Sequence, residues 1–213
     1  MVLKLLRRAI TYVLVILVIS TSAFYCNTTP DSTPDMEIRW NRSLVQDGDL
    51  IFRRGRSMAS YMVLVADRDS YYSHVGIISI EDGDSLVVHV APNEDEEISG
   101  LVQIEALGRF SRVSNASAIR VMRVSDPIVA LRASSIAKTY YQEGITFDDD
   151  FSLDSDSSMY CTELVWKAYK QAGIDLIDGA FARVSIITEE SDYILPSTLL
   201  RSNHLTEVLE VKK

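Results

Sequence analysis

Cys161, His74 and His89 are the side chains of this sequence best suited to covalent chemistry. A cysteine thiolate is a strong nucleophile, and an imidazole within hydrogen-bond reach can take the thiol proton. A second imidazole can orient the first, as the third member of a catalytic triad does. These residue types therefore favour a site in which Cys161 is the nucleophile, His74 the base and His89 the orienting group.

Cys161 is predicted to lie at the N-terminal end of an amphipathic helix that ends at Gly173. One apolar face of this helix is formed by Leu164, Val165, Ala168, Tyr169 and Ala172. Cys161 lies three residues before Leu164 and four before Val165, so it is on the same face, one turn nearer the helix N-terminus. The positive end of the helix dipole favours a thiolate, and the unpaired N–H groups of the first turn could hold an oxyanion beside the sulfur.

The two histidines lie in segments that read as a β-hairpin. Ser73–Ile80 and Leu86–Val90 are strand-like, and an Asp-Gly pair lies between them. A turn centred on that pair places His74 opposite position 91, diagonal to His89. Diagonal neighbours are roughly 7–8 Å apart at the Cα level, within reach of long side chains. The imidazoles are therefore expected to meet if the register puts them on one face.

Each of these residues also has a purely structural interpretation. A single cysteine is often a small buried apolar residue. His74 could be a polar residue at a strand end, and His89 a hydrogen-bonded histidine of the core. Two histidines and one cysteine lack the closely spaced ligand pairs of most zinc sites, so no metal or other cofactor is expected. His204, in the C-terminal tail, is expected to have no role.

The N-terminus has the pattern of an export signal. Basic residues within Met1–Arg8 precede an apolar run from Ala9 to Tyr25, which is near the lower length limit of a membrane span. Residues 1–25 are therefore predicted to be a signal peptide or a membrane anchor, residues 26–45 a polar tether, and residues 46–213 an exported domain. The domain is then periplasmic or attached to the membrane of the cell envelope.

Cys26 directly follows the export signal. It is either the lipid-modified first residue of a lipoprotein or an ordinary residue beside a cleaved signal or uncleaved anchor. Tyr25 is larger than the small residue that lipoprotein signals favour before the cysteine. Exported thiols tend to be oxidised in pairs, so the single remaining cysteine, Cys161, indicates a reactive thiol or an intermolecular link.

Charge narrows the class of partner. The chain has 21 basic and 30 acidic residues; removing Lys4, Arg7 and Arg8 leaves 18 basic residues and a charge of −12. Such an acidic domain is a poor fit for nucleic acid and for adsorption to anionic lipid. The expected partners are a small-molecule, peptide or lipid substrate, and the membrane through the N-terminus. The oligomeric state is left open.

The remaining pattern predicts one domain of mixed structure. The expected elements are a turn and strand at Asp47–Arg53, a short buried helix at Met58–Ala66, a solvated loop at Asn93–Glu97, strands at Val102–Leu107 and Ala118–Val124, a helix from Asp126 to Tyr141, a loop at Asp148–Ser158, a short helix after Ile194–Ser197 and a strand at Leu205–Val211.

Taken together, these segments resemble the permuted papain-like cysteine hydrolases, and more narrowly the YiiX/YebB-like bacterial amidases of the NlpC superfamily. The matching phrases are Gly48–Arg53, Ser73–Ile77, Val88–Ala91, Gly144–Asp148, Tyr160–Val165 and Ile194–Ser197. In ordinary papain-like enzymes the cysteine helix precedes the histidine strand, whereas here His74 precedes Cys161 by more than eighty residues. The resemblance covers roughly Gln46 to Val211.

The resemblance implies an α+β, circularly permuted papain-like fold, in which an antiparallel sheet or barrel packs against the Cys161 helix. It also implies a Cys161–His74 dyad, with His89 at a third polar position that varies in the group. The implied activity is cleavage of an amide or ester in cell-wall peptide or a lipid-linked acyl group, through an acyl-enzyme. Thr162 replaces a common serine, and an acidic stretch at Thr188–Asp192 is expected to reshape the cleft.

Asp49, Tyr160 and Glu163 are further candidates for substrate binding. Glu163 either contacts a substrate amine or a basic residue such as Arg53, or complements the helix N-terminus. Asp49 and Tyr160 either line the cleft or have structural roles. Two other functions stay open: a lipid- or peptide-binding module without turnover, and a thiol-dependent acyltransferase.

Overall fold

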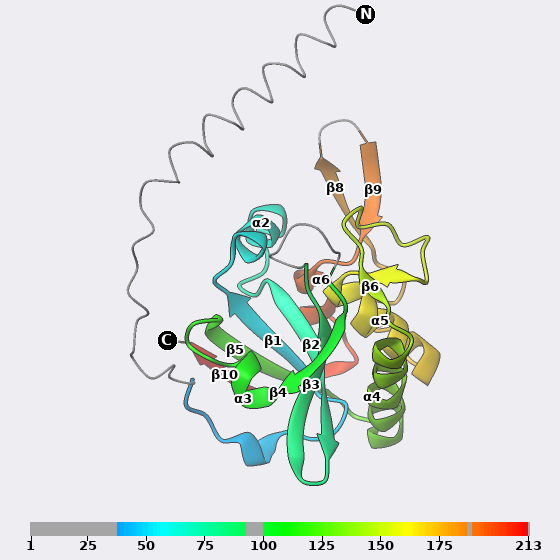
Figure 1. The fold of residues 1–213 in the computed structure, drawn as a ribbon. Coiled ribbons are helices and arrows are strands. Elements are labelled where there is room, and N and C mark those ends of the chain that lie inside the picture. The colour runs from blue at the N-terminus through cyan, green and yellow to red at the C-terminus, as the bar shows by residue number, and fades with distance from the viewer. Residues whose placement is uncertain (1–37, 93–99, 187–188, 213) are drawn as a thin grey trace, which may run out of the picture. The chain divides into compact units, whose positions relative to one another are not determined.

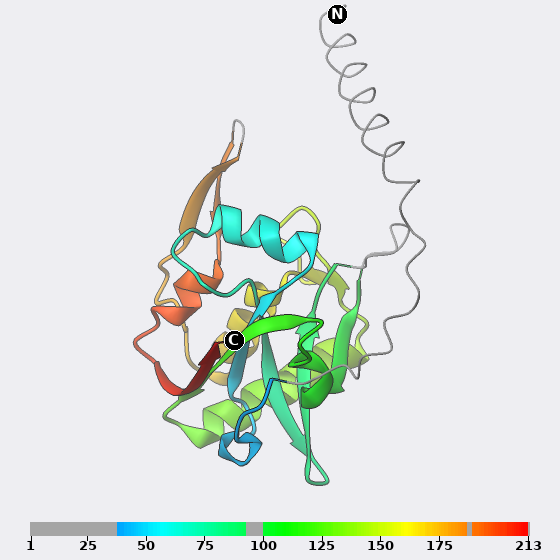
Figure 2. The ribbon, with the colours of Figure 1, turned by 90° about the vertical axis from the view of Figure 1, so that its left-hand side faces the viewer.

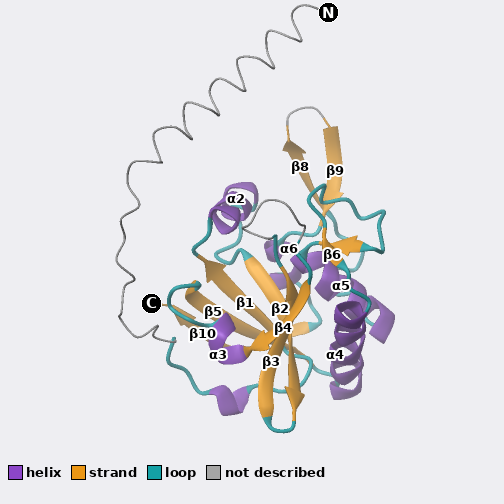
Figure 3. Ribbon diagram, in the orientation of Figure 1, coloured by secondary structure: helices purple, strands orange, loops and turns teal. Residues whose placement is uncertain are grey.

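A six-stranded antiparallel sheet, ordered β10-β5-β1-β2-β3-β4, forms the centre of the fold (Figures 1 and 3). Its strands are β1 (Leu50–Gly55), β2 (His74–Glu81), β3 (Asp84–Val90), β4 (Val102–Ala106), β5 (Ala116–Val124) and β10 (Leu205–Lys212). The expected α+β class is confirmed. Of the sheet or barrel that the resemblance implied, the structure has the sheet, which is open and has β10 and β4 as its edges.

This computed structural model describes residues 38–92, 100–186 and 189–212. The predicted export segment, Cys26 and the Asn93–Glu97 loop lie outside those ranges. The folded unit begins before Gln46, because Ile38 and Val45 are already buried against the sheet. No helix within the described ranges has the length and apolar character needed to cross a bilayer.

The β2–β3 hairpin has the predicted register. Its turn residues Asp82 and Gly83 both have positive φ, at 51° and 89°, as a two-residue turn with right-handed strand twist requires. The ladder runs from the turn to the pair Ile77↔Val88 and is not continued beyond it. The histidine positions therefore lie at the open end of the hairpin.

Two helices cover one face of the sheet, α4 (Pro127–Gln142) and α5 (Cys161–Ala172) (Figures 1 and 2). Helix α4 begins as predicted, with the Asp126 carboxylate accepting from the N–H groups of Ile128 and Val129. Helix α5 ends at Gly173, whose φ of 116° lies in the left-handed region. The apolar stripe of α5 thus fixes Cys161 at the helix start, over the sheet.

The opposite face of the sheet is covered by the short helix α3 (Leu107–Phe110) and the N-terminal residues of the domain. Strand residues alternate between the two faces. Phe52, Val75 and Val88 pack toward α4 and α5, so their neighbours Arg53, His74 and His89 belong to the α3 face. The polar side chains of the site are therefore on the opposite side of the sheet from most of α5.

Several details depart from the sequence predictions. Helix α2 forms at Met58–Ala66 as predicted, but none of its residues is buried, so the expectation of a buried helix is wrong. The strand expected at Val102–Leu107 stops at Ala106, where α3 begins. A hairpin of β8 (Ala182–Ile186) and β9 (Glu189–Tyr193) occupies part of the acidic stretch. The smaller elements are η1 (Arg42–Leu44), β6 (Thr146–Phe147), β7 (Ser158–Met159) and α6 (Pro196–Leu200).

Candidate active site

Cys161 is the first residue of α5, and its sulfur interacts with backbone N–H groups of Val75, Thr162 and Cys161 itself. Ile78 directs its N–H toward β1, so by alternation the N–H of Val75 points to the β3 side. The β2–β3 ladder has already ended at Ile77 on that side. The sulfur therefore lies at the end of the β2–β3 ladder, beside Val75, the residue that follows His74.

The expected contact between the imidazoles is present, and a carboxylate extends it. His74 Nε2 lies 3.0 Å from His89 Nδ1, and both rings are buried. His89 Nε2 lies 3.0 Å from Glu105 Oε1. Glu105 is on β4, two residues beyond Gln103, the register partner of His89, and so shares its face. The three side chains form a continuous chain, Glu105–His89–His74.

One arrangement of the tautomers suits this order of contacts. A neutral imidazole carries one N–H, and the Glu105 carboxylate can only accept. In this arrangement His89 carries its proton on Nε2, toward Glu105, and its Nδ1 accepts from the Nε2–H of His74. The lone pair of His74 is then on Nδ1, the nitrogen that is not bound to His89. His74 is in the form that a general base requires.

The charge state of both rings agrees with this assignment. Burial lowers the pKa of His74 well below 6.5, and Arg53 and His89 lower it further. Burial also lowers the pKa of His89, although Glu105 opposes this effect. Burial acts to raise the pKa of Glu105, but His89, Arg53 and Arg109 bring it below its usual value. At neutral pH the chain consists of one carboxylate and two neutral imidazoles.

Arg53 supplies a positive charge between the carboxylate and the thiol. Its Nη1 lies 3.7 Å from Glu105 Oε1 and donates to the Phe110 carbonyl at 3.3 Å. Burial lowers the pKa of Arg53, while Glu105 and Cys161 raise it. The guanidinium thus neutralises the buried carboxylate and disfavours protonation of His74 at rest.

The Cys161 thiol is neutral in the resting protein. Burial raises its pKa to about 11, although the N–H groups of Val75 and Thr162 and the charge of Arg53 act in the opposite direction. The thiol and the two imidazoles are therefore all neutral at rest, and the sulfur contacts the backbone of Val75, the residue after His74. The thiol proton has to move to a base at the moment of attack, rather than being transferred in advance.

Phe110 of α3 fixes the orientation of the polar groups. Its ring stacks on His74 at a centroid distance of 5.7 Å and meets the edge of His89 at 5.3 Å. The Arg53 guanidinium lies 4.3 Å from the same ring centroid. These contacts restrict both imidazoles to single orientations, which preorganises the base.

Gly76, in the phrase Ser-His-Val-Gly, permits the close approach of β3. A Cβ at this position would lie 2.6 Å from Val87 Cγ1, 2.9 Å from the Val88 carbonyl oxygen and 3.0 Å from His89 Cβ. A larger residue would therefore push β3 and His89 away from β2 and His74.

The three other predicted site residues are arranged differently. Glu163 is fully buried, accepts from the Tyr160 N–H at 3.2 Å and lies 3.1 Å from Lys167 Nζ rather than near Arg53. Burial raises the pKa of Glu163 to about 7, although Lys167 lowers it. These contacts support its role at the helix N-terminus.

Tyr160 and Asp49 also make structural contacts. The buried hydroxyl of Tyr160 accepts from the Ile194 N–H at 2.9 Å, which ties the start of α5 to the segment before α6. Asp49 precedes β1 at the end away from Arg53, and its carboxylate forms two 2.7 Å hydrogen bonds with Arg123. The structure does not bring Asp49 to Cys161.

The sequence reasoning did not identify Glu105, Arg53 as a site residue, or Phe110. The available signal was the alternation Gln103, Ile104, Glu105 in a predicted strand. It places the two polar residues on one face, but it does not say that the strand pairs with β3. Only the tertiary pairing brings Glu105 to His89.

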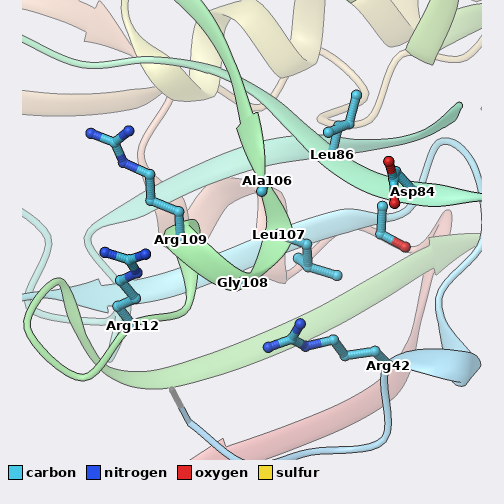
Figure 4. Close-up of a pocket in the computed structure, with 9 residues that line it drawn as sticks. Arg42, Asp84, Leu86, Ala106, Leu107, Gly108, Arg109 and Arg112 are labelled. Atoms are coloured by element: carbon cyan, nitrogen blue, oxygen red, sulfur yellow. The ribbon is translucent and has the colours of Figure 1, made fainter. Parts of the chain in front are cut away.

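A pocket of about 510 Å³ lies beside α3, and none of the residues of the Glu105–His89–His74 chain lines it (Figure 4). It is lined by Arg42, Asp84, Ser85, Leu86, Ala106, Leu107, Gly108, Arg109 and Arg112. Arg109 connects it to the site, because its Nε lies 3.5 Å from Glu105 Oε2. The pocket contains neither the thiol nor the imidazoles.

Comparison with known proteins agrees with this geometry. Residues 44–209 match the model of a family described as permuted papain-like amidase enzymes, the YaeF/YiiX or C92 family. The chain belongs to this family. The polypeptide order found here, with the histidine strand β2 before the cysteine helix α5, is that of a permuted enzyme. The family makes the chain a papain-like, cysteine amidase or peptidase-type hydrolase at the coarse level.

Two relatives extend the comparison. The uncharacterised protein YiiX of Escherichia coli K12 is 30% identical over 128 residues, which span 60% of this chain and 58% of that protein. The crystal structure of yiiX from Escherichia coli O157:H7 has a TM-score of 0.64 and 23% identity, covering 79% of this chain and 98% of that one. This second likeness shows the shared fold.

The published title of that crystal structure calls yiiX a metalloprotein. Within the described residues of this chain, no group of three His, Cys, Asp or Glu side chains is arranged to hold a metal ion. His74 and His89 instead direct nitrogens at each other. The described side chains of this site are therefore arranged to contact one another rather than to surround a metal ion.

The buried histidines should make stability depend on pH. Their pKa values are lowered in the folded protein, so the unfolded chain binds more protons as the pH falls below about 6.5. The free energy of unfolding should therefore decrease on acidification, by up to about 1.4 kcal/mol per pH unit for each histidine.

Denaturant unfolding between pH 7.5 and 5 should show a shallower decrease of this free energy for His89→Gln than for the unmodified protein. Glu163 acts in the opposite direction, but it is present in both proteins and cancels. Equal slopes would contradict the buried neutral state of His89.

Proposed function

We propose that this protein is a cell-envelope cysteine hydrolase that cleaves an amide or ester bond through an acyl-enzyme on Cys161. The observation that carries the proposal is the Glu105–His89–His74 chain, which ends beside the residue whose N–H contacts the sulfur. The export signal predicted for residues 1–25 supports an envelope location. The proposed substrates are cell-wall peptide or a lipid-linked acyl group.

In the first step, His74 Nδ1 takes the thiol proton while the sulfur of Cys161 attacks the carbonyl carbon. The imidazolium formed at His74 is stabilised through His89 by Glu105. When the tetrahedral intermediate collapses, the amine or alcohol leaves with the proton from His74. A thioester remains on Cys161. Water then attacks the thioester and gives a proton to His74. When this second intermediate collapses, the acid is released and His74 returns the proton to the sulfur of Cys161.

The oxyanion of each tetrahedral intermediate forms beside the sulfur, where backbone N–H groups converge. The N–H groups of Cys161 and Thr162 belong to the first turn of α5 and lack partners within the helix. Together with the positive end of the helix dipole, they supply preorganised donors for this charge. Charge stabilisation of this kind compensates for the raised pKa of the resting thiol.

A panel of peptide amides from cell wall and of phospholipid or acylamide substrates would test this function. The purified full chain should release free acid and amine or alcohol with multiple turnovers, in water alone. Product that appears only with an added acceptor amine or alcohol would favour the acyltransferase. Stoichiometric binding without product would favour a binding module, and either result would contradict the hydrolase.

Replacing Glu105 should affect turnover through the histidines. In Glu105→Gln, the amide has lost the negative charge and can donate to His89 Nε2 as well as accept from it. When it donates, the tautomers reverse along the chain and His74 Nδ1 carries the proton. We expect a fall in kcat of roughly 10- to 100-fold, the size of effect known for carboxylates that orient metal-bound histidines. The pH profile of kcat should also change, which a purely structural role would not require.

Glu81→Gln, on the far end of β2, is the matched control, since its exposed carboxylate pairs only with Lys138 among the interactions resolved there. Unchanged kinetics for Glu105→Gln would show that Glu105 does not act on His74 through His89.

A further inference from the structure

Helix α2 exposes an apolar stripe that the catalytic arrangement does not use. Met58, Tyr61, Met62 and Val65 follow the i, i+3, i+4, i+7 spacing of one helix face. Their side chains are between 46% and 75% exposed. Such a stripe normally packs into a core, but here it faces outward. An exposed apolar face of this kind marks an interaction surface.

The charges around the stripe favour a phosphate-rich partner. Residues 57–66 contain no charged side chain, and exposed Arg56 and Arg68 lie on either side of them. Asp67 is turned inward, with 2% exposure, and accepts from the Ser197 N–H at 2.7 Å. Exposed Asp69 is paired with Arg201 at 3.3 Å. The net charge of −9 opposes adsorption of the whole chain to an anionic membrane. The two ends of this stripe, however, carry the positive charges of Arg56 and Arg68.

Two exposed tyrosines lie on α2 or shortly after it in the sequence. Tyr61 is on the stripe, and Tyr71 is 41% exposed. The guanidinium of Arg54 lies 4.4 Å from the centre of the Tyr71 ring. Apolar residues flanked by tyrosines and arginines are the composition of a helix that lies in a membrane interface.

The path of the chain puts a membrane within reach of α2. Ile38 packs with Ala116, and Ala116 is the register partner of Gly55, two residues before the α2 N-cap Ser57. Ile38 therefore packs at the first residue of β5, which pairs with the last residue of β1. The 12 residues 26–37 separate it from the apolar segment Ala9–Tyr25. They can span at most about 40 Å when extended.

We infer that α2 docks the domain on a phospholipid bilayer, with Met58, Tyr61, Met62 and Val65 inserted below the headgroups and Arg56 and Arg68 at the lipid phosphates. The ligand is the membrane surface to which the N-terminal segment is expected to bind. Membrane docking through α2 is independent of the proposed catalysis, because α2 contains none of the residues Cys161, His74, His89 and Glu105.

The test measures lipid contact at α2 in the full chain. The protein is mixed with vesicles of phosphatidylethanolamine and phosphatidylglycerol (3:1) whose acyl chains carry bromine, and the vesicle-bound fraction is collected by flotation. Bromine quenches tryptophan that reaches the acyl chains. Tryptophan replaces Met62 in one variant, and in the control it replaces Ile128 of α4, which has 61% exposure. Trp40 and Trp166 are common to both proteins.

The fluorescence added by Met62→Trp should fall at least twofold in brominated vesicles, and that added by Ile128→Trp should not change. Arg56→Glu combined with Arg68→Glu should reduce the quenching at position 62. Equal quenching at both positions, no quenching at position 62, or no vesicle-bound fraction would overturn the proposal. So would a lipid-independent blue shift at position 62 that grows with protein concentration, since this would show that a second copy covers the stripe.

Discussion

Replacing Cys161 with alanine is expected to abolish covalent labelling by a thiol-directed acyl probe and to lower the hydrolysis rate by about 10⁴-fold or more. The hydroxyl of Thr162, the next residue of α5, donates to the Ile194 carbonyl. His74 and His89 are directed at each other, and Glu105 is ion-paired with Arg53 and Arg109. Intact-mass measurement after exposure to the probe gives the labelling stoichiometry.

The chain provides its own control for this experiment. Cys26 is the other cysteine, and Cys26→Ala should label like the unmodified protein. Removing a single sulfur from Cys161 should leave the thermal unfolding midpoint nearly unchanged, so loss of labelling would report loss of the nucleophile. Full labelling of Cys161→Ala would show that the reactive group lies elsewhere.

Replacing His74 with alanine should reduce the rate of acylation by about 10²- to 10⁴-fold, the usual contribution of a general base. The effect should be large because burial raises the pKa of the thiol to about 11, so very little thiolate exists at pH 7 without a base. Single-turnover labelling measures this rate directly. Added imidazole should restore part of it, because the variant leaves space for the missing ring.

His204→Ala is the matched control for His74. This histidine lies near the surface and contacts Asp178 at 3.0 Å. Its replacement should leave the labelling rate unchanged. A His74→Ala protein that folds, labels at the normal rate and shows no response to imidazole would disprove the role of His74 as base.

Local chemistry explains why much of this fold follows from the sequence. The Asp82-Gly83 turn fixes the hairpin register, and this register brings His74 and His89 together. Asp126 and Gly173 mark helix ends through backbone requirements that few other residues meet. These signals act over a few residues, so they can be interpreted without knowledge of the tertiary structure.

The features that escaped prediction depend on contacts between distant segments. Glu105 becomes part of the site because β4 pairs with β3, a pairing that its own alternation does not specify. The apolar composition of Met58–Ala66 predicts a helix, but not whether a core covers it. Asp49 is close to the site in sequence and remote in space, because an extended strand carries Arg53 away from it.

The same limit applies to the thiol. A helix N-terminus alone predicts a lowered pKa for Cys161. Burial between β2 and α5 has a larger effect and raises it to about 11. The sequence shows the dipole, whereas only the packed structure shows the desolvation that outweighs it. In the proposed mechanism, His74 therefore has to activate the thiol during the reaction.

Mass spectrometry of the Cys161 peptide during turnover tests the central claim most directly. The full chain is incubated with extract of the cell envelope, quenched in acid and digested. The account predicts an acyl adduct on Cys161 that hydroxylamine removes, as it does any thioester, and whose mass identifies the acyl group. The adduct should be absent in His74→Ala. Turnover without an adduct on Cys161, or with the adduct on Cys26 instead, would contradict the account.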